Sequence, residues 1–186
     1  LKNTIPVPTN EILQKMEETF KKTESSGNSE YGFVVGTKDG EQVSSSVYAG
    51  TTGSSTKVPS FQPSSGVKEL GKKGATAMYV VHSHPNVLKY DKATGDYKTS
   101  DHGSSTTDRT FNTTTTFADI VLEVQSNDPQ NISNTDKNTA SATSGTWVPR
   151  TDSTTRVITL YNSKGDLQSL KFSKFQSLIN KINSAK

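Results

Sequence analysis

Two histidines at the end of a short apolar run constrain the fold of this chain more than any other feature. Residues 77–81 are predicted to form a buried β-strand, because the run is short, apolar and β-branched near its end. His82 and His84 follow, and residues i and i+2 of a strand point to the same face. Both imidazoles can therefore converge on one point, at the edge where Pro85 ends the strand. Converging imidazoles are typical of zinc sites, which also use carboxylate ligands.

A His-x-His pair by itself is more often two surface or capping residues than a metal site, and a third ligand distinguishes the two interpretations. The chain contains no cysteine, so a zinc ion would have to be held by histidine and carboxylate side chains. A catalytic site would leave the fourth position to water. The sequence therefore predicts a metal site only if a carboxylate reaches both histidines.

The composition indicates a single domain, residues 1–186, with extensive polar loops. Only 29% of the residues are hydrophobic, and Ser, Thr and Asn are frequent. The net charge is +3 with scattered lysines, so we expect no nucleic-acid partner. We expect no membrane span either, because no apolar stretch approaches about 18–20 residues. The polar surface favours a secreted or cell-surface protein, and the start at Leu1 without a signal peptide indicates a processed product or part of a longer chain.

Hydrophobic periodicity predicts an α/β or α+β fold, in which N- and C-terminal helices flank one mixed β-sheet. A helix over 10–23, capped by Thr9 or Asn10, has an apolar face of Ile12, Leu13, Met16 and Phe20. A helix over 173–183, capped by Ser173, has a face of Phe175, Leu178, Ile179 and Ile182. Strands are expected over 30–36, 41–48, 75–84, 117–124, 156–161 and 167–172, and short helical segments over 67–73 and 105–112.

Three polar insertions are expected in this domain, over residues 50–66, 86–103 and 127–155. We interpret each of them as a surface loop. The third contains the only tryptophan, Trp147, which either fixes the insertion to the body of the domain or contacts a ligand. The second carries further candidate metal ligands: Asp91, Asp96, Asp101 and His102.

Three motifs, taken in order, resemble the signature of the JAB/MPN (JAMM) metalloprotease family. They are Glu30 at the head of an apolar strand that closes on Gly36, then His82-Ser83-His84-Pro85, then Ser105-Thr106-Thr107-Asp108. The resemblance covers about residues 30–124 and implies the family's cytidine-deaminase-like architecture. Within the family, the polar, loop-rich chain is most similar to the JAB-like domains of bacterial secreted and polymorphic-toxin proteins.

The resemblance implies a role for each motif residue. His82, His84 and Asp108 would bind Zn²⁺. Glu30 would be the general base that accepts a proton from water, and the Ser105 hydroxyl would stabilise the oxyanion. The implied reaction is hydrolysis of a peptide or isopeptide bond in a protein or peptide substrate, as an exported bacterial effector would perform it.

The chain departs from the family in the gap between His84 and Ser105, which is longer and contains the insertion 86–103. A residue of this insertion could replace Asp108 as the third ligand. Ser105 and Asp108 also match an ordinary helix cap, and Glu30 also fits a plain charge at a strand end.

Two other functions are compatible with the same motifs. A catalytically inactive JAB-like module would bind other proteins or serve a structural role at the cell surface. A zinc deaminase could use a similar sheet, but that class typically uses cysteine ligands and this chain has none. The distance of Asp108 from the two histidines distinguishes the hydrolase from the binding module.

Overall fold

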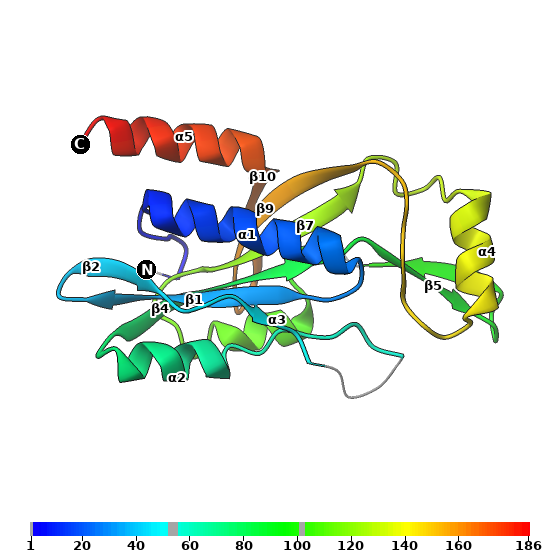
Figure 1. Ribbon diagram of the computed structural model, residues 1–186, viewed down its shortest axis with the longest axis horizontal. Helices are drawn as coiled ribbons and strands as arrows, with labels where there is room; N and C mark the ends of the chain where they lie inside the picture. Colours follow the sequence, from blue (N-terminus) through cyan, green and yellow to red (C-terminus); the bar gives the residue numbers. More distant parts are fainter. Residues whose placement is uncertain (1, 52–55, 101–102) are drawn as a thin grey trace.

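The computed structural model describes residues 2–51, 56–100 and 103–186. Its centre is a seven-stranded sheet with the order β10-β9-β7-β4-β1-β2, in which β3 also pairs with β1 (Figure 1). β4 and β7 run parallel, whereas the other described pairs of this sheet run antiparallel. The strands are β1 (Tyr31–Lys38), β2 (Glu41–Ser44), β3 (Tyr48–Ala49), β4 (Thr76–His84), β7 (Asp119–Ser126), β9 (Thr154–Asn162) and β10 (Gly165–Lys171).

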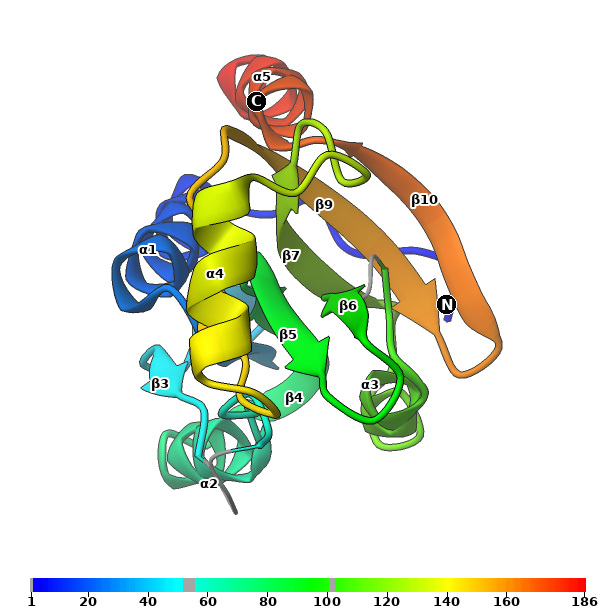
Figure 2. The same cartoon turned by 90° about the vertical axis from the view of Figure 1, so that its right-hand side faces the viewer.

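Helices cover both faces of this sheet. α1 (Asn10–Ser26) and α5 (Phe172–Ser184) lie on one face, and α2 (Ser64–Lys72) and α3 (Thr106–Phe111) lie on the other (Figures 1 and 2). Successive strand residues point to opposite faces, so Tyr79 packs in the α1–α5 core and Val80 packs in the α2–α3 core. The two histidines, at even positions like Val80, therefore point to the α2–α3 face.

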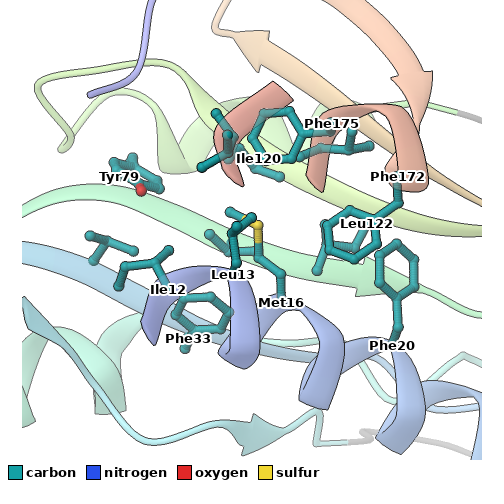
Figure 3. Packing of buried hydrophobic residues seen from close by; sticks show 14 of the residues in the cluster. Ile12, Leu13, Met16, Phe20, Phe33, Tyr79, Ile120, Leu122, Phe172 and Phe175 are labelled. Atoms are coloured by element: carbon teal, nitrogen blue, oxygen red, sulfur yellow. The ribbon is translucent and has the colours of Figure 1, made fainter. Parts of the chain in front are cut away.

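The α1–α5 core confirms the apolar stripe expected in the first helix. All four stripe residues are buried against β1, β4 and β7 (Figure 3): Ile12, Leu13, Met16 and Phe20. Thr9 is the N-cap, since its Oγ1 accepts a hydrogen bond from the Ile12 N–H. The helix ends at Ser26, three residues beyond the expected 10–23 helix, and Gly27 caps it in the left-handed conformation.

Two of the expected loops, 86–103 and 127–155, instead meet in a second small sheet, so the loop interpretation was wrong for both. β5 (Val87–Asp91) pairs with β6 (Asp96–Thr99) and with β8 (Val148–Pro149), and α4 (Asn134–Ala142) packs against them (Figure 2). A satellite core holds this unit together: Leu88, Ala140 and Val148. Leu88 follows Val87, and Val148 follows Trp147, in otherwise polar segments, and the pairing of these two distant segments buries them.

The expected loop 50–66 and helical segment 67–73 are also corrected, because α2 begins at Ser64. Gly66 is buried inside that helix, where a Cβ atom would lie 2.7 Å from Val34 Cγ2. The return strand expected over 41–48 is broken after Ser44, since the Ser45 hydroxyl accepts a hydrogen bond from the Val34 N–H at 3.0 Å. The side chain thereby replaces a rung of the strand ladder.

The last helix begins earlier than expected. Phe172 is its first residue, and its N-cap Lys171 makes no side-chain cap, so Ser173 does not have the expected capping role. Phe175 and Ile179 are buried, but Leu178 is 53% exposed. The other strand boundaries agree with expectation to within two residues.

The expected α+β class is confirmed: a mixed, mostly antiparallel sheet is flanked by helices, including the N- and C-terminal ones. Among the described residues, no helix combines the length and apolar character needed to cross a membrane.

Candidate metal centre

Strand β4 aims both histidines at one point. His82 pairs with Gly32 of β1 on one side and with Val121 of β7 on the other, so its strand is central in the sheet. The Nε2 atoms of His82 and His84 lie 3.2 Å apart. The two side chains are 0% and 11% exposed. The convergence expected from the i, i+2 spacing is therefore present in the fold.

Asp108 reaches both histidines from the first turn of α3. Its Oδ1 lies 3.2 Å from His82 Nε2, and its Oδ2 lies 3.1 Å from His84 Nε2. The helix cap positions this carboxylate, because Asp108 Oδ2 accepts the Ser105 N–H at 2.7 Å and Ser105 Oγ accepts the Asp108 N–H at 3.1 Å. The capping interpretation and the ligand interpretation of Asp108 are thus both compatible with its geometry.

His82, His84 and Asp108 form a buried group whose ligand atoms all lie within 4.8 Å of one another, and this group could hold a metal ion. Of the other candidate ligands, Asp91 forms an ion pair with Lys98 in the β5–β6 hairpin, with its Oδ2 3.0 Å from the Lys98 Nζ. Asp96 is exposed in the same hairpin. Asp101 and His102 lie outside the described residues.

In this group, the carboxylates favour the protonated form of His84 and the histidines favour the ionised form of Asp108. Burial by itself would lower the pKa of His84, but the hydrogen bond to Asp108 and the charge of Glu30 raise it to about 9. Burial opposes the ionisation of Asp108, yet the neighbouring His82 and His84 lower the pKa of its carboxyl group strongly. Both pKa shifts favour a protonated His84 beside an ionised Asp108 when no metal is bound.

Glu30 stands at the edge of the centre, immediately before β1. Its Oε1 lies 3.8 Å from His84 Nε2, and its Oε2 accepts the Phe61 N–H at 2.7 Å. Its main chain is also held, with the Glu30 N–H donating to Pro59 and the carbonyl accepting from Gly50. Burial raises the pKa of this carboxyl, and the two histidines and the Phe61 N–H act in the opposite direction. This arrangement suits a carboxylate that exchanges protons.

Ser105 lines the same cavity as Glu30 and His84. Its Oγ accepts the Asp108 N–H, and a hydroxyl that accepts one hydrogen bond still has its own proton to donate. The five motif residues from the sequence are thus close together in the fold, although they come from three separate segments.

An aromatic enclosure around His82 was not anticipated from the sequence. Its ring centroid lies 6.3 Å from that of Phe61, 5.7 Å from that of Phe111 and 6.1 Å from that of Tyr161. Among the described residues, His82 Nδ1 is buried without a hydrogen-bond partner. One signal was available: Phe61 is the single aromatic residue in the stretch 50–66.

A cavity of about 680 Å³ opens beside the centre and gives it access to solvent. Glu30, His84 and Ser105 border it, as do residues from the 57–60 segment, from β5 and β6, and Trp147 before β8. The corrected insertions therefore build the walls of this cavity.

Comparisons with protein-family models, with curated proteins and with solved structures find no match to this chain. The chemistry of the centre therefore has to follow from the geometry of its own residues.

Proposed function

We propose that this chain is a zinc-dependent amide hydrolase of the JAMM type, with a JAB/MPN-like architecture. One observation carries the proposal: the Nε2 atoms of His82 and His84 lie 3.2 Å apart, each lies 3.1–3.2 Å from one of the two Asp108 carboxylate oxygens, and the Glu30 carboxylate lies at their edge. The order of the three motifs along the chain supports the same family. The substrate class would be a peptide or isopeptide bond.

The ligand spacing favours zinc. Zn–N and Zn–O bonds of about 2.0–2.1 Å in a tetrahedron separate the ligand atoms by about 3.3 Å. The two Nε2 atoms lie 3.2 Å apart and each lies 3.1–3.2 Å from one Asp108 oxygen, and the donor set of two imidazoles and one carboxylate is a common one for zinc. When bound, zinc would polarise the amide carbonyl and lower the pKa of a water molecule.

Glu30 and Ser105 supply the remaining chemistry. Glu30, held by the Phe61 N–H and raised in pKa by burial, accepts the proton of the attacking water and passes it to the leaving amine. The Ser105 hydroxyl donates a hydrogen bond to the tetrahedral oxyanion, a contribution of about 2.7–4 kcal/mol for comparable donors. The peptide bond thus breaks with the proton transferred from water to nitrogen.

The Ser/Thr/Asn-rich composition supports an exported bacterial protein, secreted or at the cell surface, and an effector is the role that fits a hydrolase there. The alternative is a catalytically inactive JAB-like module that binds other proteins. The two differ in whether a metal-loaded centre cleaves amides.

The test combines metal content with cleavage. We expect about one zinc per chain in the wild type and in Glu30→Gln, and none in His84→Ala or Asp108→Ala, by elemental analysis of protein purified without a nickel column. Glu30→Gln should cleave a quenched peptide library at least about 100-fold more slowly than wild type.

His102→Ala is the matched control, since it removes the remaining histidine of the chain. Loss of zinc in His102→Ala with retention in Asp108→Ala would move the third ligand into the insertion. Bound zinc without cleavage of any peptide or isopeptide would support the inactive binding module. Absence of zinc from the wild type, even after zinc is added, would overturn the proposal.

A further inference from the structure

We propose that the cavity beside the metal centre selects substrates that carry a carboxylate next to the scissile amide, with Lys57 as the group that binds it. This inference rests on the proposed amide hydrolysis for the identity of the scissile bond. It concerns residues outside the three motifs.

Positively charged side chains outnumber negatively charged ones among the described residues that line the cavity. Among the residues that the structure describes, Glu30 is the one carboxylate in the cavity lining, and it is held at the centre by the Phe61 N–H. Lys57 and Lys98 come from two different segments of the wall. A bound metal ion would add further positive charge. A substrate with negative charge is therefore favoured electrostatically over a cationic one.

Lys57 is the lysine that is available to a ligand. Lys98 is already paired with Asp91 at 3.0 Å. Lys57, in contrast, has no hydrogen bond or ion pair to any residue in the described part of the chain, and it is exposed. An ammonium group without a partner on the wall of a binding cavity fits a carboxylate, with which it forms a charge-assisted hydrogen bond.

The rest of the wall fits a peptide rather than a small ion. Trp147 and Tyr97 contribute aromatic surface, and Val58, Pro85 and Val87 contribute apolar surface. The Trp147 ring is held by Lys89, whose Nζ lies 4.8 Å from the ring centroid. A volume of about 680 Å³ accommodates several amino-acid side chains, in the range of drug-sized ligand sites.

Trp147 also provides the measurement. It is the only tryptophan of the chain and it lines this cavity, so its fluorescence reports directly on occupancy. The probes are tryptophan-free, end-blocked pentapeptide libraries with one position fixed as Glu, Gln or Lys. They are titrated into zinc-loaded wild type, Lys57→Ala, Lys57→Glu and the control Lys38→Ala, which removes an exposed lysine at the end of β1.

In the wild type and in Lys38→Ala we expect the Glu library to bind about fivefold more tightly than the Gln library, the size of one partly exposed ion pair. Lys57→Ala should abolish this ratio, and Lys57→Glu should transfer the preference to the Lys library. A structural role for Lys57 would change overall binding without reversing the charge preference. Equal affinities in the wild type, or an unchanged preference in Lys57→Ala, would overturn the inference.

Two further arms separate the possible outcomes. Libraries with a free C-terminus instead of an amidated one show whether the bound carboxylate is the chain end or an acidic side chain. Either result supports the proposal if Lys57→Ala abolishes the preference for that carboxylate. Cleavage is followed separately by mass spectrometry. A Lys57-dependent preference for acidic peptides without cleavage would support the binding specificity and overturn the hydrolase. Cleavage without that preference would support the hydrolase and overturn the binding specificity.

Discussion

Asp119 is a buried carboxylate close to the metal centre, at the start of β7, and its exposed fraction is zero. Its Oδ1 accepts the Val80 N–H at 2.8 Å, and its Oδ2 accepts hydrogen bonds from Asn112 and Thr115. Burial nevertheless raises the pKa of Asp119 to about 6, against the effect of these hydrogen bonds and of His82. The ionised carboxylate is thus destabilised in the fold.

Asp119→Asn should therefore change how stability depends on pH. Because the pKa of Asp119 is higher in the folded state (about 6) than in the unfolded chain (about 3.9), the wild type has its full free energy of unfolding only below about pH 3.9. This free energy falls as the pH rises from there to about 6. In the metal-free protein, the free energy of unfolding of Asp119→Asn relative to wild type should increase by about 2 kcal/mol between pH 4 and pH 7. Urea unfolding at four pH values measures this difference. A difference that does not vary with pH would contradict the assigned pKa shift.

Ser105 has two separable roles, as the N-cap of α3 and as the proposed oxyanion donor. Ser105→Ala should lower the free energy of unfolding by about 1 kcal/mol through the lost cap, and lower kcat by about 10²–10³ through the lost donor. Chemical unfolding and steady-state kinetics on the zinc-loaded protein measure the two effects.

Ser133 is the matched control, because its hydroxyl caps α4 by accepting the Asp136 N–H at 3.1 Å. Ser133→Ala should lose comparable stability while kcat stays at the wild-type value. Equal kcat values for the Ser105 and Ser133 variants would restrict Ser105 to the capping role.

At the scale of the element, helix α2 is placed by a close approach to β1. Gly66 faces the sheet, and a Cβ atom there would lie 2.7 Å from Val34 Cγ2 and 2.9 Å from Ser45 Oγ. Gly71, in the same helix, has open space where its Cβ would be. The two glycines have the same helix propensity but different tertiary surroundings.

Gly66→Ala and Gly71→Ala should therefore change stability in opposite directions. Gly71→Ala should raise the free energy of unfolding by about 0.5–1 kcal/mol through helix propensity. Gly66→Ala gains the same propensity but overpacks the helix–sheet contact, and should lower it by about 1–2 kcal/mol net. Thermal or urea unfolding of the two variants measures the signs. Stabilisation by Gly66→Ala would mean that the helix moves away from β1 at little cost.

At the scale of the whole molecule, the metal centre joins segments that are far apart in the chain. Glu30 precedes β1, the histidines end β4, and Asp108 opens α3. A ligand that binds only the folded state stabilises it, by about 2.7 kcal/mol at a concentration of 100 times its Kd. Metal removal should therefore weaken the entire fold and not one element.

Zinc at about 100 times its Kd should raise the Tm of the metal-free wild type by about 5–10 °C, given about 2–4 °C per kcal/mol for a chain of this length. Asp108→Ala should show almost none of this increase. Differential scanning calorimetry with zinc and with a chelator makes the comparison. An equal increase in both proteins would place the stabilising ion at another site.

The sequence by itself determined the local features of this protein. The stripe from Ile12 to Phe20, the Ser105–Asp108 cap and the parity of His82 and His84 follow from the 3.6-residue and two-residue periods of helices and strands. These interactions join residues two to eight positions apart, so the spacing in the chain carries the information.

Only the tertiary structure decided what covers the metal centre and what borders its cavity. Leu88 and Val148 each belong to a short apolar stretch within a polar segment, and they are paired across sixty positions in the β5–β8 ladder. Phe61, Tyr161 and Trp147 likewise reach the centre or its cavity from distant segments. The burial of these side chains and the distances between the ligands depend on which distant segments pack together. The helical and strand periods of the sequence do not predict such long-range contacts.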